Sequence, residues 1–345
     1  MSENTIGIVY NLPASAGTLF SEASQDVLTQ VEAIEDALSR LNYPSVRIPF
    51  TRDLAAFVQM VQTSRVNMIF NLCETVDEDA HLCGHPAAVF ELLGIPFTGS
   101  PSTALMLTTD KLLTKRLLRA TGISTPKHVV FNHADSVNPA ELQFPVIIKP
   151  RFEDASVGIT QESIVTDEKA LKSRTADLSN RFGTLLIEEY IAGREFNISL
   201  FGHPSARLLP VAEIDFVDYP DSTYPILDYN AKWDKSSFEY QHTTRKFPGD
   251  LSLALQRKLE MAAHVCFRVL MLRDYGRIDL RMDDQKRFFI LEVNANPCLS
   301  PDAGFAAAIE KSGLSYVQMV ERFINFMKQR SASNVNTAAY SPGQN

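Results

Sequence analysis

The residues whose types and spacing best suit chemistry lie in two short predicted strands, GRIDLRM and FFILEV, joined by a polar turn. Apolar and polar residues alternate in the first strand, which is typical of a half-buried β-strand. If residues 284–287 form the hairpin loop, Asp283 pairs with Phe288 on the other strand. Counting outward from that pair places Asp279 opposite Glu292.

Two carboxylates placed opposite each other suggest a bound cation, because directly opposed like charges destabilise a hairpin. In the same register Arg277 lies opposite Asn294. Asp279, Glu292 and Asn294 offer only oxygen ligands, which suits a hard ion such as Mg2+ rather than zinc. A surface hairpin with scattered charge is the alternative interpretation.

Lys149 ends another apolar segment, FPVIIKP, where a lysine is costly to bury without an anion as its partner. The polar loop that follows, RFEDASVGIT, contains the small residues Ala155, Ser156 and Gly158. Such a loop can bring backbone N–H groups close to a phosphate, although it lacks the spacing of a Walker A motif. These residues indicate an anion site.

Three acids accompany the next pair of strands, in LLIEEYIAGREFNISLFG. Glu188 and Glu189 are adjacent, so their side chains point to opposite faces of an extended segment. Glu195 follows the turn at Ala192 and Gly193. Carboxylates beside a strand end can accept hydrogen bonds from the amino group or the ribose hydroxyls of a nucleotide. The alternative is an edge strand protected by charge.

A long segment, residues 217–248, is polar and aromatic and has no clear periodicity. A loop of this length inside a compact region is usually functional, often as a lid. It contains Lys232 and Trp233, the only tryptophan of the chain. We therefore expect a mobile loop that closes over a site.

A second metal cluster is conceivable at His81-x-Cys83-x-His85, where alternating ligands could share a strand face. Its spacing matches no common zinc pattern, so a polar loop leading into the helix of PAAVFELLG is the favoured interpretation. Just before it, Asn71, Cys73 and Glu74 lie at the end of a buried strand. Ligands bind beyond the carboxyl ends of strands in parallel sheets, which makes these three residues candidate neighbours of a site.

The composition is that of an ordinary globular protein, with 345 residues, 45% hydrophobic and 21% charged. A net charge of −8 argues against broad nucleic-acid binding, which needs a basic excess. No stretch approaches the roughly 20 apolar residues of a membrane span, and the N-terminus lacks a signal-peptide pattern. Four dispersed cysteines are expected to be free thiols. These features predict a cytoplasmic protein.

The elements that must position these residues begin with strands that alternate with helices, which predicts a parallel, doubly wound α/β sheet in the N-terminal part. We predict helices at residues 21–41, 53–63, 103–120, 251–272 and 313–329. The helix at 103–120 is strongly amphipathic and contains Lys111, whose position is that of a solvated face. Residues 331–345 are expected to form a disordered tail.

The order of the motifs is more informative than any one of them. Taken in their order along the chain, the motifs resemble the D-alanine–D-alanine ligase branch of the ATP-grasp superfamily. They are FNLCE, ELLGIPFTGS, DKLLTKRLLRATGISTP, FPVIIKP, SVGI, LIEEYIAGREF, DYNAKW, GRIDLRM and LEVNANPCLSP. The resemblance implies an N-terminal α/β domain at residues 1–103. Two α+β ATP-grasp subdomains would follow at residues 104–186 and 187–330, with ATP between their antiparallel sheets.

The resemblance also carries roles to individual residues. Lys111 and Lys149 match lysines that contact ATP, and Ser156 matches the serine of the phosphate loop. Glu188, Glu189 and Ile191 match residues at the adenine edge. Glu195 matches the carboxylate that binds the ribose, and Lys232 matches a lysine that reaches the terminal phosphate. Asp279, Glu292 and Asn294 match Mg2+ ligands, with Mn2+ as the alternative ion, and Arg277 matches an arginine that stabilises the oxyanion of the tetrahedral intermediate. Arg277, Lys232 and Ser156 are therefore the expected catalytic residues.

The reaction implied by the resemblance joins a small-molecule carboxylate to an amine. The carboxylate attacks the γ-phosphate of ATP to give an acylphosphate and ADP, and the amine then displaces phosphate to form an amide. Cations must neutralise the charge that gathers in the first step, and a closing lid must keep water from the acylphosphate. The resemblance also suggests a homodimer.

The substrate end departs from the pattern of the D-alanine enzymes. The first strand is followed by NLPASAG rather than a Gly-Gly-x-Ser-x-Glu loop. Trp233 replaces a lid tyrosine, Cys298 a glycine, and Ala303 a substrate-contacting serine. We therefore expect an amino acid, small peptide or natural-product acceptor rather than strictly D-alanine. The alternatives are a genuine D-alanine–D-alanine ligase of cell-wall synthesis, an ATP-grasp kinase that phosphorylates a small acceptor, and a non-catalytic ATP-binding module.

Overall fold

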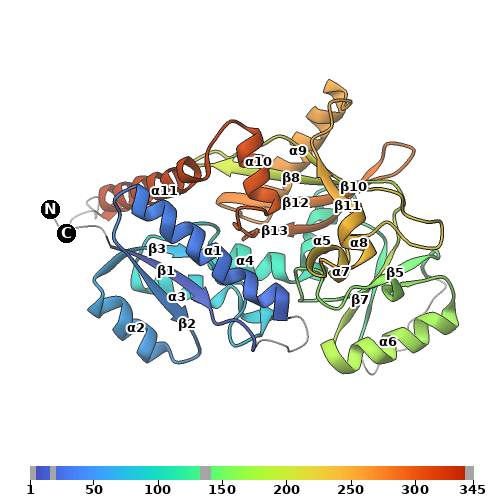
Figure 1. Ribbon diagram of the computed structural model, residues 1–345, viewed down its shortest axis with the longest axis horizontal. Coiled ribbons are helices and arrows are strands. Elements are labelled where there is room, and N and C mark those ends of the chain that lie inside the picture. Colours follow the sequence, from blue (N-terminus) through green and yellow to red (C-terminus); the bar gives the residue numbers. More distant parts are fainter. Residues whose placement is uncertain (1–4, 16–20, 133–140, 339–345) are drawn as a thin grey trace, which may run out of the picture.

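A computed structural model of the chain describes residues 5–15, 21–132 and 141–338. Within these residues the strands form three sheets, which Figure 1 shows with helices packed around them. The first sheet is parallel, as predicted, with the order β2 (Ser45–Phe50), β1 (Thr5–Asn11), β3 (Val66–Asn71). The other two sheets are antiparallel.

Helices cover both faces of the parallel sheet, because its strands are apolar on both sides. On one face α1 (Ser21–Arg40) and α11 (Tyr316–Ala338) pack against β1 and β3, and Figure 1 shows these two helices side by side. On the other face lie α2 (Leu54–Thr63) and α3 (His85–Leu93), preceded by the 3-10 helix at Ala80–Leu82. The doubly wound arrangement is therefore confirmed.

The helix predicted at residues 103–120 is in fact two helices, α4 (Ser102–Thr109) and α5 (Lys111–Ala120). Asp110 separates them with an extended backbone, and its side chain accepts from the backbone N–H of Leu113 at 3.1 Å. The same carboxylate pairs with Arg151, with a shortest N–O distance of 2.5 Å. The break places Lys111 in the first turn of α5, where it is buried rather than solvated. A local cap thus overrides the continuous amphipathic pattern.

The middle sheet has the order β4 (His128–Phe131), β7 (Leu185–Glu189), β5 (Val146–Pro150), β6 (Ile164–Val165). Helix α6 (Glu168–Phe182), which follows a 3-10 turn at Gln161–Ser163, packs on one face against the alternate residues Val146 and Ile148. Because side chains alternate along a strand, the intervening Ile147 and Lys149 point to the opposite face.

The third sheet has the order β11 (Thr243–Lys246), β10 (Ala212–Phe216), β8 (Arg194–Gly202), β12 (Asp274–Met282), β13 (Phe288–Asn294), with β9 (Arg207–Leu208) paired to β8. The predicted pairing of Asp279 with Glu292 is confirmed, as is that of Arg277 with Asn294. The inner pair differs from the prediction, since Phe288 lies opposite Met282 and not Asp283. A bulge in β13 absorbs the extra residue and restores the outer register.

Two further predictions need correction. The segment 217–248, expected to be a loop, contains α7 (Tyr229–Trp233), α8 (Phe238–His242) and the edge strand β11. The last helix does not end near residue 329 but continues to Ala338, so the first part of the predicted tail is helical; residues 339–345 lie outside the described residues. Helices α9 (Leu253–Val269) and α10 (Gly304–Lys311) complete this part of the chain.

Candidate active site

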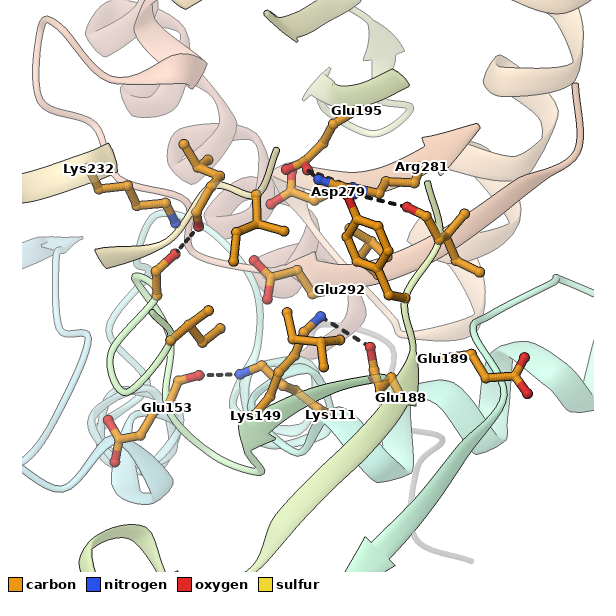
Figure 2. A pocket seen from close by; sticks show the side chains of 18 residues that line it. Lys111, Lys149, Glu153, Glu188, Glu189, Glu195, Lys232, Asp279, Arg281 and Glu292 are labelled. Carbon is orange, nitrogen blue, oxygen red and sulfur yellow. Dashed lines mark hydrogen bonds and ion pairs between the residues drawn. The ribbon is translucent and has the colours of Figure 1, made fainter. Parts of the chain in front are cut away.

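A cavity that is open to solvent lies between the middle and third sheets. Figure 2 shows side chains from β5, β7, β12 and β13 converging on it. The predicted site residues that line the cavity are Lys111, Lys149, Ser156, Glu188, Glu189, Ile191, Glu195, Lys232, Asp279 and Glu292. Arg277, Trp233, Asn294, Cys298 and Ala303 are not among the lining residues.

The Glu188 carboxylate is fully buried between two lysines. Its Oε2 lies 3.1 Å from Nζ of Lys149, and its Oε1 lies 2.8 Å from Nζ of Lys115. Burial alone would raise the pKa of Glu188, but the two lysines outweigh it and lower the pKa to about 2. Glu188 is therefore ionised and pairs with both lysines, of which Lys149 lines the cavity.

Lys115 was missed by the sequence analysis. It is 1% exposed, and its ammonium also donates to the backbone oxygen of Leu291, at the bulge of β13, over 2.7 Å. Burial lowers its pKa, and the nearby Lys149 adds to this effect. In the sequence Lys115 follows Lys111 by four residues on an amphipathic helix, which is also the pattern of a solvated face.

Glu292 lies at the centre of the cavity (Figure 2). Burial would raise its pKa, but Lys111, Lys232 and Lys149 lower it to about 2. The ammonium of Lys111 also donates to the backbone oxygen of Glu153. Several cations thus face the cavity around one carboxylate, an arrangement that suits a polyanionic ligand.

The Asp279 carboxylate is held from three sides. Arg277 donates to both of its oxygens over 2.8 Å, and the side-chain amide of Asn197 donates to Oδ1, also over 2.8 Å. The amide of Asn294 donates to Oδ2 over 3.2 Å. Asp279 and Glu292 lie opposite each other at one end of the hairpin, with Asn294 two residues further along β13, and these three residue types suit a hard divalent cation.

The loop after β5 makes hydrogen bonds with the segment 217–248. Ala155, Ser156 and Gly158 have left-handed backbone conformations, with φ of 54°, 62° and 78°. Ser156 Oγ donates to the backbone oxygen of Leu227 over 2.7 Å, and the indole N–H of Trp233 donates to the backbone oxygen of Ala155 over 3.0 Å. Trp233 therefore contacts the loop that was expected to bind phosphate.

Glu189 points away from Glu188, as expected for neighbouring strand residues (Figure 2), and accepts from the backbone N–H of Gln143 over 3.0 Å. Glu195 instead forms a buried ion pair with Arg281, a cavity residue that the sequence analysis did not identify. Arg281 continues the alternation of arginines in GRIDLRM, and nothing in that pattern distinguishes it from a surface charge.

The predicted substrate residue Cys298 belongs to a separate polar cluster. Its thiol donates to Oδ2 of Asp26 over 2.9 Å, and Ser300 donates to Oδ1 of the same carboxylate over 2.8 Å. Gln30 donates to Glu74 over 2.8 Å, while burial and the nearby Asp26 raise the pKa of Glu74 to about 7. Glu74 was a candidate neighbour of a site, whereas Asp26 and Gln30 were not foreseen.

Ala303 precedes α10 at its N-cap position and makes no side-chain capping bond there. The members of the proposed His81-x-Cys83-x-His85 cluster have different neighbours. The ring of His81 lies tilted against that of Phe152, with 4.4 Å between the ring centroids. Cys83 contacts the hydroxyl of Thr109 at 2.7 Å, and His85 lies against the backbone oxygen of Leu82. These neighbours support the interpretation of this segment as a polar loop.

Comparisons with known proteins agree with this architecture. Residues 117–325 match the family described as D-ala D-ala ligase C-terminus. A D-alanine–D-alanine ligase of Pseudomonas putida is 30% identical over 291 residues, covering 84% of each chain. An uncharacterised protein of Sinorhizobium fredii is 30% identical over 268 residues, covering 77% of this chain and 76% of that protein.

A solved D-alanine–D-alanine ligase of Bacillus anthracis, crystallised with ATP, superposes with a TM-score of 0.76 at 20% identity, covering 96% of this chain and 99% of that one. This likeness shows the ATP-grasp fold. No helix in the described part of the chain is long and apolar enough to cross a membrane. By its sequence matches, the chain belongs to the D-alanine–D-alanine ligase family and is an ATP-dependent, ADP-forming ligase.

Proposed function

We propose that this enzyme joins a substrate carboxylate to an amine through an acylphosphate. The observation that carries the proposal is the group of lysines, Lys111, Lys149 and Lys232, around the ionised Glu292 inside the cavity. Transfer of the γ-phosphoryl group to a carboxylate gathers negative charge, which preorganised cations stabilise. The lysines would hold the phosphates of ATP, while no protein nucleophile is needed.

The remaining cavity residues complete the nucleotide site. Ser156 and its left-handed loop would bind phosphate, the backbone between Glu189 and Ile191 would meet the adenine edge, and Glu195 would accept from the ribose. Glu188 would act by holding Lys149 in place, which its buried ion pair supports.

Asp279, Glu292 and Asn294 would hold Mg2+, whose chemistry is to draw together and neutralise the phosphate oxygens. The donor set of two carboxylates and one amide fits that ion. Arg277 orients Asp279 through its two hydrogen bonds, and its charge opposes the rise that burial causes in the pKa of Asp279. The same guanidinium would stabilise the oxyanion that forms when the amine attacks the acylphosphate.

We propose that the substrates are amino acids or small peptides other than strictly D-alanine. The departures at the substrate end support this, among them Cys298, which stands where the D-alanine enzymes have a glycine and donates to Asp26. A strict D-alanine–D-alanine ligase is the second candidate, supported by relatives of that name at 30–31% identity. A homodimer is proposed from the family alone, and light scattering of the purified enzyme tests it.

The experiment that tests the proposal measures ADP release with amino acids supplied singly and in pairs, followed by mass spectrometry of the products. Amide products from pairs other than two D-alanines are the expected result. Turnover with a pair of D-alanines and with no other pair would show a strict D-alanine–D-alanine ligase. A phosphorylated product without amide would show a kinase, and ATP binding without turnover would show a binding module.

A further inference from the structure

Arg281, in β12, is one of the most thoroughly buried charges in the described residues, at 3% exposure. Its Nε and Nη2 both donate to Oε2 of Glu195, over 2.9 and 2.8 Å. Its Nη1 donates to the backbone oxygen of Ile191 over 2.9 Å, and Nη2 also donates to the backbone oxygen of Pro225. One side chain therefore contacts three separate segments (Figure 2 shows its bond to Glu195).

These three segments are the ones expected to meet the nucleotide and to close over it. Ile191 lies in the connection after β7, Glu195 lies on β8 directly opposite Arg281, and Pro225 lies in the segment 217–248. The guanidinium also lies 5.0 Å from the ring centroid of Tyr190. Only a planar fork with several donors can reach all these acceptors at once, which a lysine cannot do.

The pairing also determines which part of Glu195 remains available. Both donors from Arg281 go to Oε2, and among the described residues Oε1 has no hydrogen-bond partner. The two hydrogen bonds thus fix the orientation of the carboxylate and leave a single acceptor oxygen.

We propose that Arg281 is a positioning residue that couples recognition of the ribose by Glu195 to the placement of the segment 217–248. The proposal rests on the role proposed above for Glu195 in nucleotide binding. A ribose hydroxyl that donates to Oε1 stabilises the ion pair, and the ion pair holds the backbone of Pro225. The coupling is reciprocal, so placement of the segment strengthens nucleotide binding to the same degree.

Calorimetric titration of the whole enzyme with Mg2+ and ATP, 2′-deoxyATP or 3′-deoxyATP tests the first half of this coupling. A hydrogen bond to a charged acceptor contributes about 1.5 kcal/mol or more, so the wild type should bind ATP roughly 10-fold more tightly than one of the deoxy analogues. In Arg281→Met this preference should fall to about 2-fold. Arg281→Lys keeps a charge beside Glu195 and should recover part of the preference.

The fluorescence of Trp233, the only tryptophan, tests the second half, because this residue lies in the segment 217–248. ATP should change its emission in the wild type, and both substitutions at Arg281 should remove most of that change, since a lysine cannot also hold Pro225. The matched control is Arg194→Met, which removes an arginine that pairs with Glu213 on the same sheet, outside the cavity. This control should keep both the preference and the emission change.

Equal binding of all three nucleotides by the wild type would overturn the ribose role of Glu195 and this proposal with it. A wild-type preference that persists in Arg281→Met, or an emission change that persists in both variants, would overturn the proposal alone. If Arg281→Met does not fold, Arg281→Lys provides both measurements. The amide-forming reaction is not used in these experiments, so its failure would be seen separately in the ADP-release assay.

Discussion

The surroundings of Glu188 differ from what its neighbours in sequence suggest. In the strand LLIEE it resembles an exposed acid, yet its side chain is completely buried between Lys115 and Lys149. Removing one partner from a buried ion pair is far more costly than forming the pair is favourable, because it leaves an uncompensated charge. Variants of these partners should therefore reveal the coupling directly.

The pH dependence of stability should report on this pair. The pKa of Glu188 is about 2 in the folded protein against an ordinary value of 4.5, so its ionised form stabilises the fold above pH 4.5. That contribution is lost as the pH falls from about 5 towards 2. In Lys115→Met the pKa should be lowered less, which makes the fall in unfolding free energy with acid shallower.

Urea unfolding between pH 3 and 7 measures this difference. Arg116→Met, at the exposed neighbouring position of α5, is the matched control and should follow the wild type. Equal slopes for Lys115→Met and Arg116→Met would contradict the assignment of Lys115 as the cause of the low pKa.

Removing the charge of Glu292 should abolish catalysis. Glu292→Gln loses the carboxylate at the centre of the cavity, and we expect kcat to fall at least about 100-fold, as when other preorganised electrostatic groups are removed. Circular dichroism should show a nearly unchanged fold. Glu310→Gln, at an exposed site in α10, is the control. Activity within a few-fold of the wild type would exclude Glu292 from the metal and phosphate site.

At the scale of elements, the break between α4 and α5 is what brings Lys111 into the cavity. Asp110 caps α5 through the backbone N–H of Leu113 and holds Arg151 through its other contacts. In a continuous helix the side chains of α5 would point in a different direction. The amphipathic pattern belongs to α5, whereas α4 has little amphipathic character, so the pattern of the whole stretch does not mark the boundary at Asp110.

Loss of this cap should therefore affect both stability and nucleotide binding. Asp110→Ala removes a cap and an ion pair, and we expect a loss of about 1–2 kcal/mol in unfolding free energy together with a raised KM for ATP. Asp167→Ala is the matched control, since Asp167 caps α6 in the same way by accepting from the backbone N–H of Ala170 over 2.8 Å, away from the cavity. It should lose similar stability at an unchanged KM. If the KM for ATP rises in both variants, the effect comes from general destabilisation of the fold and not from the cap of α5.

At the scale of the whole molecule, one buried carboxylate joins the parallel sheet to the third sheet. Asp274, in β12, accepts from the backbone N–H of Gly99 over 3.0 Å and lies 2.5 Å from Nη1 of Arg330 in α11. Arg330 in turn donates to the backbone oxygen of Phe97 over 2.6 Å. These contacts hold the parallel sheet against the strands that carry the proposed metal ligands. The polar cluster around Cys298 and Asp26 rests partly on that sheet.

Arg330→Met should destabilise the whole molecule, because it leaves Asp274 buried with weaker compensation. We expect a loss of about 3 kcal/mol in unfolding free energy, within the usual range for a broken buried pair. Arg322→Met, at an exposed position of the same helix, should have little effect. Thermal unfolding of both variants makes the comparison, and equal midpoints would show that this joint contributes little.

The sequence by itself determined the class of each sheet, the outer register of the hairpin from Arg277 to Asn294, and the family, because these depend on local periodicity and on the order of motifs. The tertiary structure alone decided the burial of Lys111, Lys115 and Arg281. Each is a cation on an amphipathic segment, and its neighbours in sequence do not distinguish a solvated position from an ion pair. The partners of Lys115 and Arg281 lie 73 and 86 residues away along the chain, so only folding brings the charges together.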